Sequence, residues 1–139
     1  MNKHLDNAIF IMMILVLIFA IGCVIVLIYP FKVIEFNDPY KVLTPVVQAG
    51  NLMQYRRDSV KYMQLTGDLS CHFEDGLIYA IPSVESNNPV GPLSGVVSIQ
   101  IPKELPPGTY IYKCTVTYKL AGIRELRYEF QTEAFEVTK

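Results

Sequence analysis

The sequence predicts an all-β sandwich of about seven strands, preceded by one N-terminal transmembrane α-helix. Three observations support this prediction. An apolar run without an ionisable residue covers residues 8–29, short segments of alternating polar and apolar residues follow it, and no segment with a helical period occurs elsewhere. We therefore divide the chain into a short tail (1–7), a transmembrane helix (8–29) and a β-domain (30–139).

The apolar run is long enough to cross a bilayer. As a helix it would extend about 33 Å, close to the thickness of the hydrocarbon core. About fifteen of its residues are Leu, Ile, Val or Phe, and each favours insertion by roughly 0.3–0.6 kcal/mol. A cleaved signal peptide has an apolar region of only about 7–15 residues followed by a small-residue cleavage site. We therefore interpret residues 8–29 as an uncleaved signal anchor in contact with the lipid bilayer.

Cys23 raises an alternative to the uncleaved anchor, which is a lipoprotein. Residues 20–23, Ala-Ile-Gly-Cys, resemble the lipobox of bacterial lipoproteins, in which the cysteine is acylated. In lipoproteins the residues after the cysteine are usually polar, whereas residues 24–28 continue the apolar pattern. The favoured interpretation of Cys23 is a small polarizable residue within a membrane helix.

The length of the tail indicates the orientation in the membrane. The positive-inside rule does not discriminate, because Lys3 lies on one side of the run and Lys32 and Lys41 lie on the other. A short tail before a signal anchor usually stays in the cytoplasm. We therefore expect a single-pass protein of a bacterial inner membrane, with the β-domain in the periplasm or outside the cell.

The charge of the chain is nearly balanced, with a formal net charge of −1 at pH 7. The largest basic cluster of the β-domain is the pair Arg56-Arg57. Such a distribution argues against nucleic acid as a partner and against binding to anionic membrane surfaces.

Extended segments follow one another through the β-domain. They cover residues 32–36, 41–43, 51–63, 69–73, 77–81, 96–101, 109–120, 124–130 and 134–137. Segment 109–120 alternates most clearly, with an aromatic and apolar face opposite a polar one. In segment 51–63, Arg56-Arg57-Asp58 indicates a bulge or an exposed kink. Segment 134–137 is expected to continue segment 124–130 past a bulge.

Turn signals separate these segments. Asp75-Gly76 between two apolar runs is a strong hairpin signal. Residues 83–95 are rich in Ser, Asn, Pro and Gly and are expected to form a loop. Several short strands with regularly spaced turns are typical of a sandwich or a barrel, and we predict two sheets with their apolar faces packed together.

Residues 105–114, Leu-Pro-Pro-Gly-Thr-Tyr-Ile-Tyr-Lys-Cys, resemble the approach to strand F of immunoglobulin-like domains. There, a Tyr two residues before a Cys forms the tyrosine corner. Tyr112 and Cys114 have that spacing, so the resemblance implies an immunoglobulin-like sandwich in which the Tyr112 hydroxyl bonds back to the corner. Two features depart from the antibody pattern: the chain has no Trp, and Cys71 lies later than the expected B strand.

The whole chain also resembles small membrane-anchored immunoglobulin-like proteins of unknown role from tailed bacteriophages. The shared motifs are the N-terminal anchor, Lys61-Tyr62, the segment 75–79 (Asp-Gly-Leu-Ile-Tyr) and the segment 128–130 (Tyr-Glu-Phe). These motifs are structural, so the resemblance implies no catalytic residue. It implies a protein of the host envelope, of superinfection exclusion or of the virion.

Cys71 and Cys114 are the two cysteines of the β-domain. In an exported domain they could form a disulfide, which requires Cα atoms within about 7 Å of each other. Two separate core thiols are the alternative, and the sequence favours it.

The remaining candidate chemistry is metal binding or catalysis at Cys71-His72. Met53 and Met63 are soft metal ligands, but the second histidine, His4, lies on the other side of the apolar run or at its edge. Neighbouring side chains on a strand point to opposite faces, so Cys71 and His72 cannot cooperate easily as nucleophile and base. We expect no metal, no cofactor and no enzymatic activity.

Together these features predict a membrane-tethered module that acts through contact with another protein. The rival function is an accessory subunit of a membrane enzyme or secretion complex, in which the helix packs against partners. That function predicts a small-residue motif such as Gly-x-x-x-Gly, which the run lacks. A redox or metal carrier is a third hypothesis.

Overall fold

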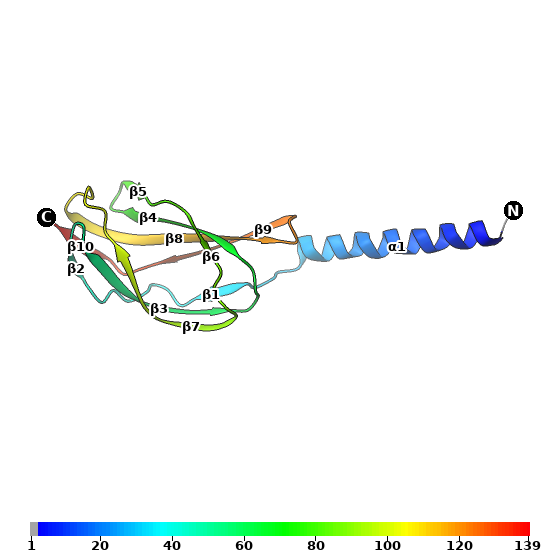
Figure 1. Ribbon diagram of the computed structural model, residues 1–139, viewed down its shortest axis with the longest axis horizontal. Coiled ribbons are helices and arrows are strands. Elements are labelled where there is room, and N and C mark those ends of the chain that lie inside the picture. Colours follow the sequence, from blue (N-terminus) through cyan, green and yellow to red (C-terminus); the bar gives the residue numbers. More distant parts are fainter. Residues whose placement is uncertain (1–2) are drawn as a thin grey trace.

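The apolar run forms one helix that stands clear of the β-domain (Figure 1). The computed structural model describes residues 3–139, and α1 covers Lys3–Ile28. The helix therefore includes most of the predicted tail, of which residues 1 and 2 lie outside the described residues. Its segment Asp6–Ile28 is long and apolar enough to cross a membrane, and no residue of its most apolar 18-residue window is buried.

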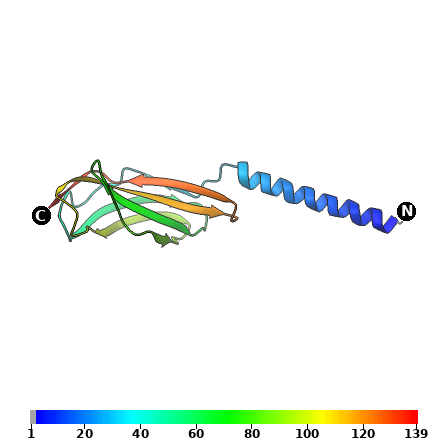
Figure 2. The ribbon, with the colours of Figure 1, turned by 90° about the horizontal axis from the view of Figure 1, so that it is seen from above.

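The rest of the described chain is mostly β-structure, arranged as two packed sheets (Figures 1 and 2). The smaller sheet has the order β1 (Ile34–Phe36), β3 (Leu52–Lys61) and β7 (Gly91–Gln100). The larger sheet has the order β2 (Val46–Gln48), β10 (Phe135–Thr138), β8 (Gly108–Leu120), β4 (Gly67–Glu74) and β5 (Ile78–Ala80). In addition, β6 (Val84–Ser86) pairs with β4, and β9 (Arg124–Gln131) pairs with β8.

This arrangement confirms the predicted sandwich but not the predicted number of strands. The described residues form ten strands, where about seven were expected. Two of the additional strands, β2 and β6, are three residues long each. Strand β6 lies within the predicted loop 83–95, and β7 begins inside the same stretch.

Strands β9 and β10 lie along the same edge of β8. Lys113 pairs with Gln131, whereas Tyr110 pairs with Phe135, so the register shifts by one residue between the two strands. An extra residue on one side of an antiparallel pair is the signature of a bulge. The last segment therefore continues the one before it past a bulge, as the sequence predicts.

The bulge predicted at Arg56-Arg57-Asp58 is absent. Strand β3 pairs with β7 in one unbroken antiparallel register from Leu52 opposite Gln100 to Lys61 opposite Gly91. The side chains of β3 alternate throughout, so the three polar residues fit the pleat without a bulge.

The predicted hairpin at Asp75-Gly76 is confirmed. Glu74 pairs with Ile78 across a three-residue turn, in which Gly76 has a φ of 101°. A positive φ is readily adopted by glycine and rarely by other residues, which explains the glycine at this position.

The core lies between the sheets and is rich in aromatic residues. Strand β8 supplies its centre, because alternate residues from Tyr110 to Tyr118 are buried. Across from them, Tyr40 stacks on Tyr55, with ring centroids 5.8 Å apart. The alternation predicted for segment 109–120 is therefore confirmed.

Candidate functional site

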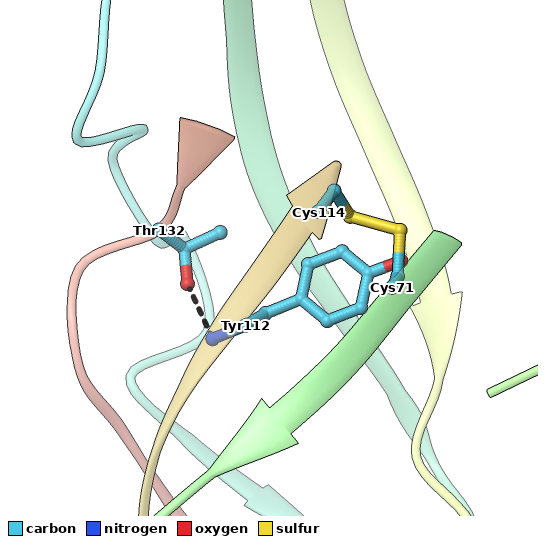
Figure 3. Close-up of a disulfide and its surroundings, with 4 residues drawn as sticks. All are labelled: Cys71, Tyr112, Cys114 and Thr132. Atoms are coloured by element: carbon cyan, nitrogen blue, oxygen red, sulfur yellow. Dashed lines mark hydrogen bonds between the residues drawn. A yellow bond between two sulfur atoms is a disulfide. The ribbon is translucent and has the colours of Figure 1, made fainter. Parts of the chain in front are cut away.

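The two cysteines of the β-domain lie directly opposite each other on β4 and β8 (Figure 3). Their Cα atoms are 4.1 Å apart, and a disulfide of 2.08 Å joins their sulfur atoms. The sequence favoured two separate thiols, because the register between two strands 43 residues apart is not visible in a single sequence. Both side chains face the core.

Tyr112 lies beside this disulfide but does not form the tyrosine corner. Its ring packs between Tyr55 and Phe73, and burial raises the pKa of its hydroxyl to about 12. Its backbone N–H donates to Thr132 Oγ1 at 3.2 Å (Figure 3).

The corner contact is made two residues earlier. Tyr110 Oη donates to the carbonyl oxygen of Pro106, four residues upstream, at 2.8 Å. The prediction for Tyr112 was therefore wrong. The two tyrosines share the inner face of β8, and Tyr110 is the one at the strand's beginning, within reach of the turn.

His72 and Cys71 lie on opposite faces of β4, with Cys71 buried and His72 half-buried on the outer face. On that face, His72 Nε2 lies 3.7 Å from Glu74 Oε2, and Lys113 forms a salt bridge with the same carboxylate. The hydrogen bond from Lys113 is the largest cause that lowers the pKa of Glu74. Within the described residues, no cluster of three His, Cys, Asp or Glu side chains could hold a metal ion.

Cys23 lies in the part of α1 that the bilayer would surround. It is partly exposed, and it takes no part in a disulfide. The favoured interpretation of Cys23, a residue within a membrane helix, stays a prediction, and acylation stays its alternative.

The junction between helix and sandwich has its own contacts, which the sequence did not predict. Arg124 Nη1, at the beginning of β9, donates to the carbonyl oxygens of Tyr29 at 2.6 Å and Val26 at 3.3 Å. The last turn of α1 contains no basic residue. Arg124 therefore supplies the positive charge that a helix C-terminus favours. It binds Val26 O in the last helical turn and Tyr29 O just after it, and Tyr29 O also accepts from the Phe31 N–H.

A second residue of β9 holds the connector between α1 and β1. Tyr128 Oη donates to the carbonyl oxygen of Phe31 at 3.0 Å and accepts from the N–H of Val33 at 3.1 Å. Both views place the β8–β9 turn beside the C-terminal end of α1 (Figures 1 and 2). Arg124 and Tyr128 thus bind both ends of the connector. Only their separation of more than 90 residues hides this contact in the sequence.

A buried lysine stabilises the same end of the sandwich. Lys61 Nζ donates to the carbonyl oxygens of Leu65 at 2.7 Å and Asn88 at 2.6 Å, and it lies 5.6 Å from the ring centroid of Tyr118. Burial lowers the pKa of Lys61. This side chain links the β3–β4 connection to the β6–β7 connection.

The opposite end of the sandwich exposes apolar side chains. Leu77 and Ile78, in the β4–β5 hairpin, are 66% and 70% exposed. The neighbouring turn before β8 exposes Pro106 and Pro107. The two turns lie together, since a Cβ at Gly108 would stand 3.6 Å from Asp75 Oδ2. We call Leu77, Ile78, Pro106 and Pro107 the distal tip.

Comparisons with known proteins find a likeness at the level of structure only. No family model and no curated protein sequence matches the chain. The sporulation control protein Spo0M from Bacillus subtilis aligns with a TM-score of 0.44 and 10% identity over 78% of this chain. This chain spans 51% of the length of that structure.

A second solved structure is the CARDB domain of the PF1109 protein from Pyrococcus furiosus, determined in complex with di-metal ions. It aligns with a TM-score of 0.34 and 12% identity, over 74% of this chain and 91% of that chain. Similarities of this strength do not assign an activity. The class of protein is therefore defined by the chain's own features, a β-sandwich behind one long apolar helix.

Proposed function

We propose that the protein is a single-pass membrane protein whose immunoglobulin-like sandwich binds another protein outside the cytoplasm. The observation that carries this proposal is α1. Within its segment Asp6–Ile28, an 18-residue window has a mean hydropathy of 3.4, and none of that window is buried inside the structure. A helix that is apolar on all sides needs an apolar environment, and a bilayer provides it.

The disulfide supports export of the sandwich. Disulfides form and persist in oxidising compartments and are rare in the cytosol. A bond between Cys71 and Cys114 is therefore favoured on the periplasmic or extracellular side of the membrane.

The connectivity supports the immunoglobulin-like assignment. The chain contributes β1 to the smaller sheet and then crosses to the larger one, where β2 lies parallel to β10 at the sheet edge. Strand β8 lies at the centre of the larger sheet and begins with the Tyr110 corner contact. The disulfide departs from the antibody pattern, because it joins two strands of one sheet, whereas the antibody disulfide joins two sheets.

The proposed contact with another protein rests on the distal tip. An exposed apolar cluster at one end of a domain is a common feature of protein interfaces. Because α1 leaves the sandwich at the other end, a membrane anchor would hold the distal tip farthest from the lipid (Figure 1). A phage-encoded role in the host envelope is the biological context that the resemblance of the chain implies, and no catalytic step is part of the proposal.

The anchor is tested by membrane extraction of the full chain expressed in bacteria. We expect the protein to stay in the membrane fraction after alkaline carbonate treatment. Replacing Leu15 and Leu17 by Arg should release it, because each Arg near a helix centre opposes insertion by about 2.5–3.5 kcal/mol. Replacing the exposed Leu77 and Ile78 of the distal tip by Arg is the matched control and should change nothing in this assay. Release of the unmodified chain would contradict the proposal.

Orientation is tested by fusing alkaline phosphatase after Lys139. The enzyme is active only where its own disulfides form, so an active fusion is expected and an inactive one would reverse the orientation. In the same strain, the intact mass of Cys23→Ser should differ from that of the natural chain by the side-chain change alone. Loss of an acyl mass would establish a lipoprotein.

A further inference from the structure

Strand β7 is a long edge strand that lacks the features that usually protect such an edge from other chains. It pairs with β3 on one side, and no other strand of the described chain pairs with it (Figure 1). The edge strands β1, β2, β5 and β6 are three residues long each. Strand β7 is ten residues long.

Edges of this length are normally protected from other chains by charges, prolines or bulges. Strand β9, the other long edge strand, carries Arg124, Glu125, Arg127 and Glu129. Strand β7, Gly-Pro-Leu-Ser-Gly-Val-Val-Ser-Ile-Gln, contains no charged residue, and its pairing with β3 contains no bulge. Its one proline, Pro92, is near the beginning and leaves the following residues open.

The hydrogen-bond pattern identifies the free backbone groups. Ile101 N–H donates to Asn51 O in the pair that continues the β3–β7 ladder. In an antiparallel ladder, alternate residues direct both backbone groups to the same neighbour. The odd-numbered residues of β7 therefore face β3. The N–H and C=O groups of Ser94, Val96 and Ser98 face the open edge, where they have no backbone partner in the described chain.

The inner face beside this edge is incompletely covered. Val97 and Ile99 are only half-buried, although they pack against the core. Gly95 adds no side chain, and a Cβ there would meet no atom within 4 Å. A cavity of about 130 Å³ lies between the sheets at this point, and it is lined by Val97 and by Arg57, whose Nε is buried without a partner.

We propose that β7 binds an extended, uncharged segment of a partner protein as an additional strand. The free backbone groups would bind the main chain of that segment, and its alternate apolar side chains would cover Val97 and the cavity. A second copy is a poorer occupant, because two chains anchored in one membrane present β7 in the same direction and could pair it only as parallel strands, which is the less stable arrangement. The choice of occupant thus rests on the proposed membrane anchor.

The test uses the full chain in lipid nanodiscs and a fluorescein-labelled peptide of four Thr-Val repeats with a terminal lysine. We expect a rise in fluorescence anisotropy with the natural chain, and none with a peptide in which a central Val is replaced by Pro. Ser98→Pro removes one donor from the open edge and no donor to β3, and should weaken binding about tenfold or more. Ser98→Ala keeps that donor and should bind like the natural chain.

Hydrogen exchange of the natural chain provides a measurement that does not depend on folding of the proline variant. Saturating peptide should slow amide exchange at Ser94, Val96 and Ser98 by about tenfold or more. Absence of binding, or binding without protection of these amides, would overturn the proposal. Self-crosslinking of the natural chain that Ser98→Pro abolishes would assign the edge to a second copy instead.

These results can be told apart from failure of the anchor. A chain that inserts into nanodiscs but binds no peptide overturns the strand addition alone. A chain that does not insert, but binds the peptide in aqueous solution, overturns the anchor and leaves the open edge of β7 as assigned.

Discussion

Breaking the Cys71–Cys114 bond should destabilise the sandwich by about 4 kcal/mol. The disulfide closes a loop of 43 residues, and the loss of chain entropy in a cross-linked unfolded state gives about that value at 25 °C. Either Cys71→Ala or Cys114→Ala removes the bond. The two single variants and the double variant should therefore lose nearly the same free energy of unfolding.

Separate thiols would behave differently. Each substitution would then remove one small buried group at a cost of about 1 kcal/mol, and the two losses would add. Urea unfolding of the full chain in detergent, followed by tyrosine fluorescence, can measure the difference, because the chain contains nine Tyr and no Trp. Cys23→Ala is the control and should leave the midpoint unchanged. Additive losses, or three free thiols in the denatured unreduced protein, would refute the cross-link.

Three further perturbations test the corner, the junction and the outer face. Tyr110→Phe should lower the free energy of unfolding by about 1 kcal/mol, the value of one hydrogen bond, whereas a larger loss for Tyr112→Phe would restore the sequence-based assignment. Arg124→Gln should speed amide exchange in residues 29–33 by about tenfold, and unchanged exchange would show that the contact does not hold the connector. Lys113 holds the pKa of Glu74 below its usual 4.5, so this carboxylate stabilises the fold above pH 4.5 and stops doing so as the pH falls through the lower value. Thermal melting of Glu74→Gln should therefore depend less on pH in acid than that of the natural chain, and equal acid dependence would contradict this.

The parts of the fold that the sequence predicts correctly are those with local signals. The alternation of β8, the Asp75-Gly76 hairpin and the bulge before β10 each depend on residues close together in the chain. Period-two patterns and turn residues are sufficient for such features. The apolar helix is the strongest of these signals, although α1 begins at Lys3 and ends at Ile28 where residues 8–29 were predicted.

The features that the sequence does not predict depend on pairing across the fold. Strands β2 and β6 are too short to show a period, and each exists because a distant strand offers an edge. The disulfide requires the register of β4 against β8. Arg124 reaches the helix end only because the β8–β9 turn lies there, and its sequence surroundings contain no sign of that role.

The contacts at the helix end also couple the rotation of α1 about its own axis to the rotation of the sandwich. Arg124 binds the end of α1, and Tyr128 binds the connector that follows. The rotational position of the helix about its axis therefore determines the direction in which each sheet faces. A neighbour that packs against one side of the helix within the lipid would thereby select the side of the sandwich turned toward it. The packing of the helix would then determine in which direction along the membrane plane the open edge of β7 faces.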